Sequence, residues 1–279
     1  MTRDRLRSRA AEDVRTVTAA GRSLRVSVRT GTDADVPPLL LMNGIGASLE
    51  VLQPFVDALD ARRTVIRFDV PGVGGSPRPV VPYVLGTLTP VVAGVLSRLG
   101  HDRPVDVLGL SWGGGLAQHF AVQHRRRCRR LVLAATGTGT LMVPGSPKVL
   151  SRMLTPRRHR DPEYAREIAG QIYGGTMRSD PERAARVLHA ATRIGPRRGY
   201  YYQLASSTGW SSLPFLRLIR QPTLVLAGDD DPIVPVANAR IMGRLLPDAD
   251  VHVYRGGHLA LLTEADELAP VVEQFLDRP

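Results

Sequence analysis

The sequence predicts an α/β protein with a mostly parallel, eight-stranded sheet, helices on both faces of the sheet and an inserted helical lid. Two observations predict this class. Short apolar runs alternate with longer amphipathic stretches, which is the pattern of the strand and helix units that build a parallel sheet. Several runs are apolar at every position, as in Leu39-Leu40-Leu41-Met42, and strands that are buried on both faces have this composition.

The predicted strands and helices follow one another in a regular order. Ala20-Gly21-Arg22 connects the first two strands as an antiparallel hairpin, and we expect the remaining strands to be parallel. The strands are expected at residues 14–19, 23–29, 38–42, 64–69, 104–110, 131–135, 223–227 and 250–254. The helices that cover the sheet are expected near residues 49–61, 84–99, 112–124, 236–246 and 264–276.

One long segment interrupts this alternation. It begins with turn-forming residues, among them Gly137, Pro144 and Gly145. It continues with amphipathic stretches that predict helices near residues 162–173, 182–193 and 198–207. We therefore expect residues 137–215 to form a helical lid, inserted into a core domain that is made of residues 1–136 and 216–279. A chain of 279 residues with 43% hydrophobic content is long enough to bury one substantial core.

The net charge of +11 comes almost entirely from arginine, because Lys148 is the only lysine. Basic clusters at residues 3–9, 125–130 and 157–160 are not interleaved with aromatic residues, so nucleic acid is not an expected partner. Attraction to an anionic particle or lipid surface stays open.

The sequence lacks the patterns that are typical of several other classes of protein. The single cysteine, Cys128, cannot build a disulfide framework, and the histidines other than His258 lack metal-ligand spacing, so no metal is expected. Pro77 breaks the match of the glycine-rich stretch 72–76 to a dinucleotide-binding motif, and no cofactor is expected. No apolar run of about 18 residues is present, so no transmembrane segment is expected. The charged N-terminus lacks the apolar stretch of a secretory signal, which predicts a cytoplasmic location.

Ser111 is the central residue of the pentapeptide Gly109-Leu110-Ser111-Trp112-Gly113, which follows an apolar run and precedes small, helix-forming residues. The pattern G-x-S-x-G is typical of a nucleophile elbow, a sharp turn between a strand and a helix that exposes the serine hydroxyl. Glycine is required on both sides because a Cβ atom there would collide with the turn. The pattern predicts Ser111 as a nucleophile.

A base and an acid follow Ser111, each after its own apolar run, in the chain order Ser, Asp, His. His258 is the expected general base. The acid comes from a cluster of three aspartates, of which we favour Asp231, four residues before Pro235. We expect Asp229 and Asp230 to form the turn, since aspartates before a proline are common in turns.

An oxyanion hole requires backbone N–H groups that point at the developing negative charge. One expected donor is the amide of Trp112, directly after the nucleophile, and the other is the amide of Ile45 in the loop that follows the apolar run 39–42. Asn43 and Gly44 open this loop and are expected to contact substrate.

Seven blocks extend the pattern, at residues 43–47, 68–76, 111–114, 131–136, 142–150, 172–175 and 220–232. With them the sequence resembles the intracellular depolymerases of medium-chain-length polyhydroxyalkanoates, in the α/β-hydrolase superfamily. The blocks at 142–150 and 172–175 are the most discriminating because they lie in the expected lid. The resemblance implies hydrolysis of the ester bonds of stored 3-hydroxyalkanoate polyester, release of 3-hydroxy acids and association with storage granules.

Large side chains near the elbow and in the lid suggest an apolar cleft for alkyl chains, in a sequence with only 5% aromatic residues. Packing of the lid against the core is the equally weighted alternative for any one of them. These residues are Trp112, Met142, Tyr173, Tyr200, Tyr201 and Trp210.

Other functions would use the same triad, since the fold does not determine the substrate. They include an esterase for small soluble esters, a carbon–carbon bond hydrolase and a cofactor-free haloperoxidase. Ser111 argues against related polyester synthases, which use cysteine at this position, and against dehalogenases, which use aspartate. A granule-binding structural protein with an inactive site is the alternative outside enzymes.

Overall fold

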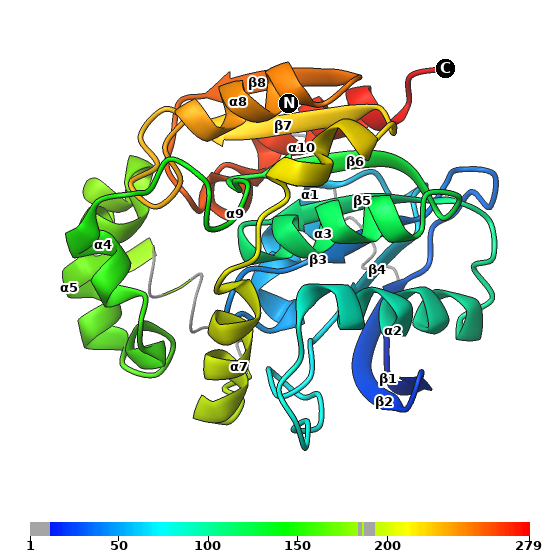
Figure 1. The fold of residues 1–279 in the computed structure, drawn as a ribbon, viewed down its shortest axis with the longest axis horizontal. Helices are drawn as coiled ribbons and strands as arrows, with labels where there is room; N and C mark the ends of the chain where they lie inside the picture. The colour runs from blue at the N-terminus through cyan, green and yellow to red at the C-terminus, as the bar shows by residue number, and fades with distance from the viewer. Residues whose placement is uncertain (1–11, 184–185, 187–192) are drawn as a thin grey trace, which may run out of the picture.

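One eight-stranded sheet forms the centre of the molecule in a computed structural model that describes residues 12–183, 186 and 193–279. The strand order is β1-β2-β4-β3-β5-β6-β7-β8. The strands are β1 (Glu12–Ala19), β2 (Arg22–Arg29), β3 (Leu39–Met42), β4 (Val65–Phe68), β5 (Val105–Leu110), β6 (Cys128–Ala134), β7 (Thr223–Gly228) and β8 (Ala249–Tyr254). β2 pairs antiparallel with β1 and β4, and the other pairs are parallel, which confirms the predicted mostly parallel sheet (Figure 1).

The first two strands form the predicted hairpin. Ala20 and Gly21 connect them with φ angles of 45° and 71°, and two positive φ angles in a two-residue loop match the twist of the flanking strands. The strand order was not predicted: β4 lies between β2 and β3, so β3 pairs with both β4 and β5. As a result, β3 and β5 are neighbours near the middle of the sheet and end at the same edge.

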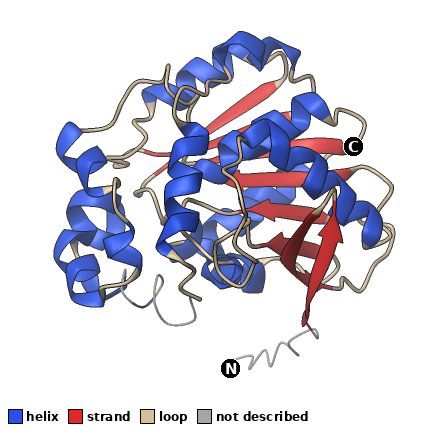
Figure 2. Cartoon of the chain, turned by 60° about the horizontal axis from the view of Figure 1, so that its bottom comes forward, coloured by secondary structure: helices blue, strands red, loops and turns tan. Residues whose placement is uncertain are grey.

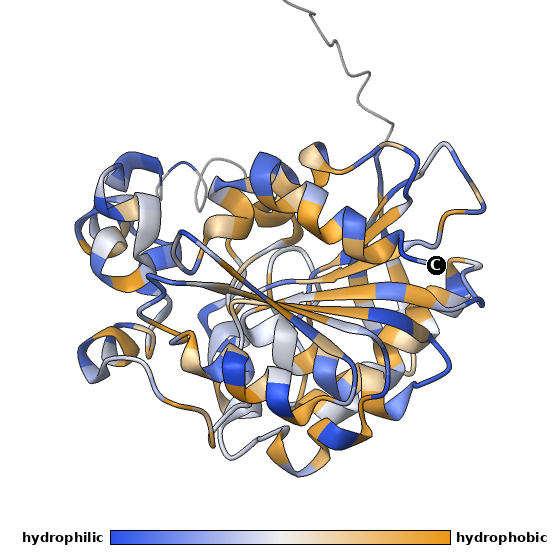
Figure 3. Ribbon diagram, turned by 90° about the horizontal axis from the view of Figure 1, so that it is seen from above, coloured by the Kyte–Doolittle hydropathy of each residue, from blue (hydrophilic) through white to orange (hydrophobic). Residues whose placement is uncertain are grey.

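Helices cover both faces of the sheet (Figure 3). Leu39 and Leu41 pack into the core under α1 (Gln53–Ala58), α9 (Ala260–Thr263) and α10 (Ala265–Leu276). Leu40 and Met42 pack into the opposite core, under α2 (Leu85–Arg98), α3 (Trp112–Gln123) and α8 (Ala237–Leu245). The alternation follows from the two-residue period of a strand and explains why all four positions are apolar.

One covering helix differs from its predicted range, and another matches its range but follows a short helix that was not predicted. The stretch expected near 49–61 is a short 3-10 helix, η1 (Leu49–Leu52), followed by α1. Pro54 lies in the first turn of α1, where the missing N–H of a proline costs no intrahelical hydrogen bond. The stretch expected near 264–276 is α10, preceded by the short helix α9.

The segment between β6 and β7 contains α4 (Pro147–Arg152), η2 (Pro156–His159), α5 (Pro162–Tyr173), η3 (Gly175–Arg178), α7 (Arg197–Ser207) and η4 (Leu213–Leu218). α4 and α5 lie together beside one end of the sheet (Figures 1 and 2). α5 and α7 occupy the ranges expected for two helices, whereas the helix expected at 182–193 lies largely outside the described residues. α5 begins where Asp161 accepts a hydrogen bond from the Tyr164 N–H and Pro162 occupies the first turn.

No helix within the described part of the chain is both long and apolar enough to cross a membrane.

Candidate active site

Ser111 is the single residue between the end of β5 and the start of α3. Its φ and ψ angles are 54° and −117°, a conformation that costs a residue with a side chain about 1–3 kcal/mol. The Ser111 N–H donates to the Ala134 carbonyl at 2.9 Å, and the Ser111 carbonyl accepts from Gly114 N and Thr136 Oγ1, both at 2.8 Å. These three bonds hold the strained turn in place.

Two glycines make this turn possible. A Cβ atom on Gly109 would overlap with the Gly113 carbonyl, and a Cβ atom on Gly113 would overlap with the Met42 carbonyl at the end of β3. The elbow therefore packs directly against the strand that carries the loop 43–47.

His258 and Asp231 meet Ser111 in one chain of hydrogen bonds. His258 Nε2 lies 3.0 Å from Ser111 Oγ, and His258 Nδ1 lies 2.8 Å from Asp231 Oδ2. The side chains of His258 and Asp231 are only 5% and 1% exposed. Asp231 Oδ1 accepts bonds from the N–H groups of Ile233 and Val234, each at 2.9 Å, so the carboxylate is fixed on its far side. A carboxylate in this place orients the imidazole and stabilises its protonated form.

The other two aspartates of the cluster have different partners. Asp229 Oδ1 accepts from the Gly256 N–H at 3.0 Å. Asp230 forms a two-pronged ion pair with Arg178 at 2.7 and 2.8 Å, and this hydrogen bonding lowers the pKa of the Asp230 carboxyl. The structure therefore brings Asp231 to His258, while the side chains of Asp229 and Asp230 in the same loop bond to other segments.

The loop after β3 lies beside Ser111, and Gly44 and Ile45 line the same pocket as Ser111. The N–H of Gly44 donates to Asn43 Oδ1 at 2.8 Å, and that of Gly46 donates to Gln203 Oε1 at 2.7 Å. Within the described residues, the N–H groups of Ile45 and Trp112 donate to no protein acceptor. The Asn43 amide shapes the loop, because Asn43 Nδ2 donates to the Ser48 carbonyl at 2.7 Å.

A pocket opens beside Ser111 and His258, which both line it. Its polar lining includes Asn43, Arg158, His159 and Tyr173, together with Gly44 of the loop. Its apolar lining consists of Ile45, Ala47, Val51, Leu110, Met153, Leu259 and Leu262. The pocket combines an apolar wall, which suits an alkyl chain, with a small number of fixed polar groups.

Of the six large side chains that we expected in the substrate cleft, Tyr173 alone lines this pocket in the described structure. Met142, Tyr201 and Trp210 pack elsewhere. Trp210 packs with the core under α3, on the opposite face of the sheet from the pocket wall, and its Nε1 donates to His119 Nδ1 at 3.0 Å. Tyr201 is 44% exposed and stacks edge-on against Tyr200. Met142 packs against Gly137.

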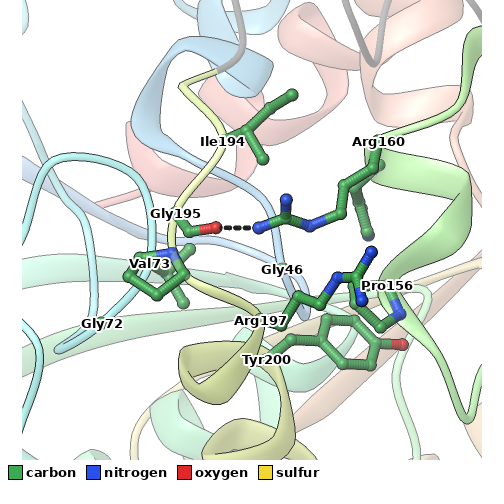
Figure 4. A pocket seen from close by; sticks show the side chains of 11 residues that line it. Gly46, Gly72, Val73, Pro156, Arg160, Ile194, Gly195, Arg197 and Tyr200 are labelled. Atoms are coloured by element: carbon green, nitrogen blue, oxygen red, sulfur yellow. Dashed lines mark hydrogen bonds between the residues drawn. The ribbon is translucent and has the colours of Figure 1, made fainter.

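Tyr200 and Trp112 lie next to the pocket but do not line it. Tyr200 lines a neighbouring pocket together with Gly46, Arg160 and Arg197, and Figure 4 shows the two arginine side chains extending into it. The indole of Trp112 is buried against α7, where its Nε1 donates to the Gln203 carbonyl at 3.0 Å. The side chain of Trp112 is therefore a packing group, while its backbone amide stays beside Ser111.

Sequence patterns missed three residues of the site. Gln203 is 1% exposed and contacts both the loop at Gly46 and the Trp112 ring. Arg158 and His159 are buried in the pocket although they stand in a basic cluster, which resembles a solvated surface in sequence. No local pattern distinguishes these residues, because the contacts join segments that are far apart in the chain.

The model of the alpha/beta hydrolase fold family matches residues 37–265. The chain is 48% identical over 265 residues to the poly(3-hydroxyalkanoate) depolymerase of Ectopseudomonas oleovorans, which covers 95% of this chain and 92% of that protein. It is 28% identical over 254 residues to the 2-hydroxy-6-oxo-2,4-heptadienoate hydrolase of Pseudomonas putida, covering 86% and 88% of the two chains. The enol-lactonase structure from Burkholderia xenovorans LB400 superposes with a TM-score of 0.81 at 24% identity, over 95% of this chain and 100% of that one.

Proposed function

Because the chain belongs to the alpha/beta hydrolase fold family, we propose that it is a serine hydrolase that cleaves the ester bonds of medium-chain-length poly(3-hydroxyalkanoate). The observation that carries the proposal is the chain of hydrogen bonds from Ser111 through His258 to Asp231. It occurs in a protein that is 48% identical to a polyester depolymerase. The apolar wall of the pocket supports alkyl side chains on the substrate.

The first chemical step forms an acyl-enzyme. Ser111 Oγ attacks the ester carbonyl while His258 Nε2, 3.0 Å away, takes its proton. The carbonyl carbon–oxygen bond to the next polymer unit then breaks, and His258 returns the proton to the leaving oxygen, which becomes the hydroxyl of a 3-hydroxyacyl unit. Asp231 orients the imidazole so that Nε2 faces Ser111, and the Asp231 carboxylate stabilises the positive charge of the protonated imidazole.

The second step hydrolyses the acyl-enzyme. A water molecule gives a proton to His258 and attacks the acyl carbon, after which Ser111 leaves with the proton and the acid is released. In both steps the carbonyl oxygen becomes an anion. We assign its stabilisation to the N–H groups of Ile45 and Trp112, since the neighbouring N–H groups of Gly44 and Gly46 already have acceptors.

We assign residues 137–215 to a lid that borders the site and contacts the polymer. α5 supports this role because the Tyr173 carbonyl at its end accepts the His258 N–H bond at 2.7 Å. Exposed apolar side chains of the same segment, Leu141 and Leu154 at 62% and 56%, offer a surface for a polyester granule. The basic N-terminal residues Arg3, Arg5, Arg7 and Arg9 lie outside the described part of the chain, and any granule contact through them is part of the proposal.

Granule binding can be tested by cosedimentation at low salt and at 1 M salt. The electrostatic screening length falls to about 3 Å at 1 M salt, so charge-driven binding is lost while apolar binding persists. We expect most of the protein to remain bound at 1 M, with a salt-sensitive fraction that disappears when residues 1–12 are deleted. If the protein fails to sediment with granules at every salt concentration tested, the polymer is not its natural substrate.

The function is tested on amorphous granules of medium- and short-side-chain polyesters, beside p-nitrophenyl esters of graded length. We expect release of 3-hydroxy acids from the medium-chain polymer and no release by Ser111→Ala. Activity on the small esters alone would favour the alternative of a soluble esterase or a carbon–carbon bond hydrolase. A fluorophosphonate probe that fails to label Ser111 in the folded protein would favour a granule-binding protein with an inactive site.

A further inference from the structure

Arg158 places a guanidinium group in the wall of the pocket that contains Ser111 and His258. The residue lies in the short helix η2, follows the exposed Arg157, and is itself only 2% exposed. Most of the remaining wall is apolar. A positive charge inside such a wall is unusual for a pocket that receives only alkyl chains, because the removal of a charge from water costs free energy unless polar partners compensate it.

Two tyrosines hold Arg158 in position. Arg158 Nη1 donates to the Tyr200 hydroxyl at 2.9 Å, and the guanidinium carbon lies 5.4 Å from the centre of the Tyr200 ring. The Tyr200 hydroxyl in turn donates to the Met153 carbonyl. Burial lowers the pKa of Arg158, but its interactions with Tyr173 and Tyr200 outweigh burial and raise it, so the group stays charged. Burial also raises the pKa of Tyr173, which therefore remains a neutral phenol.

We propose that Arg158 forms a carboxylate subsite, which binds the free carboxylate at the end of a polyester chain and directs hydrolysis to the terminal ester bond. The inference rests on the proposed function and names which part of the polymer enters the site. Arginine binds carboxylates well because its planar fork matches their two oxygens.

The chemistry of the polymer explains why the two groups share one pocket. In a terminal 3-hydroxyalkanoate unit, only two carbons separate the ester oxygen from the carboxylate carbon. A carboxylate that is bound by the enzyme must therefore lie in the same chamber as Ser111, and Arg158 lines that chamber. The alkyl side chain of the unit is left to face the apolar wall near Val51, Leu259 and Leu262.

The reaction at the chain end balances as an ordinary acyl transfer. Ser111 Oγ attacks the carbonyl of the penultimate unit, and the bond from that carbonyl carbon to the 3-oxygen of the terminal unit breaks. His258 passes the Ser111 proton to this oxygen, which releases one 3-hydroxy acid with its carboxylate at Arg158. Water then frees the shortened chain, which ends in a new carboxylate.

The neighbouring pocket adds the positive charges of two arginines, Arg160 and Arg197. His159 lines both pockets, and Arg160 and Arg197 line the second one, where Arg160 donates to the Gly195 carbonyl (Figure 4). Clustered cations raise the local concentration of anionic ligands. A polymer chain that extends from the pocket beside Ser111 into the neighbouring pocket therefore meets positive charges that attract its carboxylate.

The test compares two dimers of 3-hydroxyoctanoate, one with a free carboxylate and one whose terminal carboxylate is a primary amide. We expect wild-type kcat/KM to be at least about tenfold higher for the free acid, since bonds to charged groups are the stronger ones. In Arg158→Met the ratio should fall to about one, and Arg158→Lys should keep part of it. Arg157→Met is the matched control, because Arg157 belongs to the same short helix but is exposed and lies outside the pocket lining; its ratio should equal that of the wild type.

Each result decides between outcomes. A merely structural role of Arg158 predicts a lower melting temperature and equal losses on both dimers, and that result would overturn the inference. If Arg158→Met does not fold, competition on the wild type replaces it: octanoate should inhibit at least about tenfold more strongly than octanamide, and equal inhibition would overturn the inference. If neither dimer nor the polymer is hydrolysed, the proposed function itself fails. If both dimers are cleaved at the same rate, the function stands and only the carboxylate subsite is lost.

Discussion

Replacing Gln203 with methionine removes the oxygen that accepts the Gly46 N–H bond at 2.7 Å. The bond joins α7 to the loop that carries the Ile45 amide, while the Gln203 carbonyl, which is unchanged in the variant, accepts the bond from the Trp112 ring at 3.0 Å. Gln203 thus holds both sides of the proposed oxyanion hole. We expect Gln203→Met to lower kcat more than it changes KM, because an oxyanion forms only in the transition state.

The expected size follows from two limits. A buried N–H group without an acceptor costs about 1–3 kcal/mol. Gly46 is partly buried, so this range is the upper limit for the loss in the free energy of unfolding. Complete loss of one oxyanion donor costs about 100- to 1000-fold in kcat, and a displaced loop retains part of the interaction. The structure therefore predicts a decrease in kcat of about ten- to a hundredfold.

The assay is steady-state hydrolysis of p-nitrophenyl octanoate, with thermal unfolding measured on the same samples. Gln203→Glu keeps an acceptor for Gly46 and should retain more activity than the methionine variant. Gln221→Met is the control, since Gln221 is also buried but bonds to the Ala121 and Arg125 carbonyls far from the site. The reasoning is refuted if both methionine variants lose stability equally and neither loses kcat.

Three further predictions concern the triad and α3. Ser111→Ala and His258→Ala should each reduce ester hydrolysis about a million-fold, and the double variant should be no worse, because the residues act as a unit; a strongly additive loss would contradict a shared triad. Burial lowers the pKa of His119, whose neutral Nδ1 accepts the Trp210 bond. As the pH falls, His119 is therefore protonated in the unfolded chain before it is protonated in the folded protein, and the free energy of unfolding should fall below about pH 6.5. His119→Gln should weaken this pH dependence in urea titrations, and an unchanged dependence would argue against the prediction. Trp210→Ala should lower the melting temperature and reduce activity on octanoyl and butyryl esters alike, whereas a selective loss on the octanoyl ester would place the ring in the substrate cleft after all.

Local patterns in the sequence were sufficient for the elements that are defined by neighbouring residues. The turn at Ser111 requires glycines two residues away on each side, and this requirement is written in five consecutive positions. The run that becomes β3 is apolar throughout, and that of β5 is apolar except for Asp106, because both faces of the sheet are covered. Asp231 could be favoured over Asp229 and Asp230 from its spacing to Pro235, and it is the aspartate that lies 2.8 Å from His258.

The order of the strands and the composition of the pocket were decided only by the tertiary structure. Trp210 and Tyr173 look alike in sequence, as aromatic residues of one segment between β6 and β7, but Tyr173 lines the pocket beside Ser111 while Trp210 packs on the opposite face of the sheet. Arg157 and Arg158 are adjacent arginines, yet one is exposed and the other is buried beside Tyr200. The physical reason is the same in both cases: a side chain's surroundings depend on which distant segments pack against it, and a single sequence records the spacing along the chain, not those contacts.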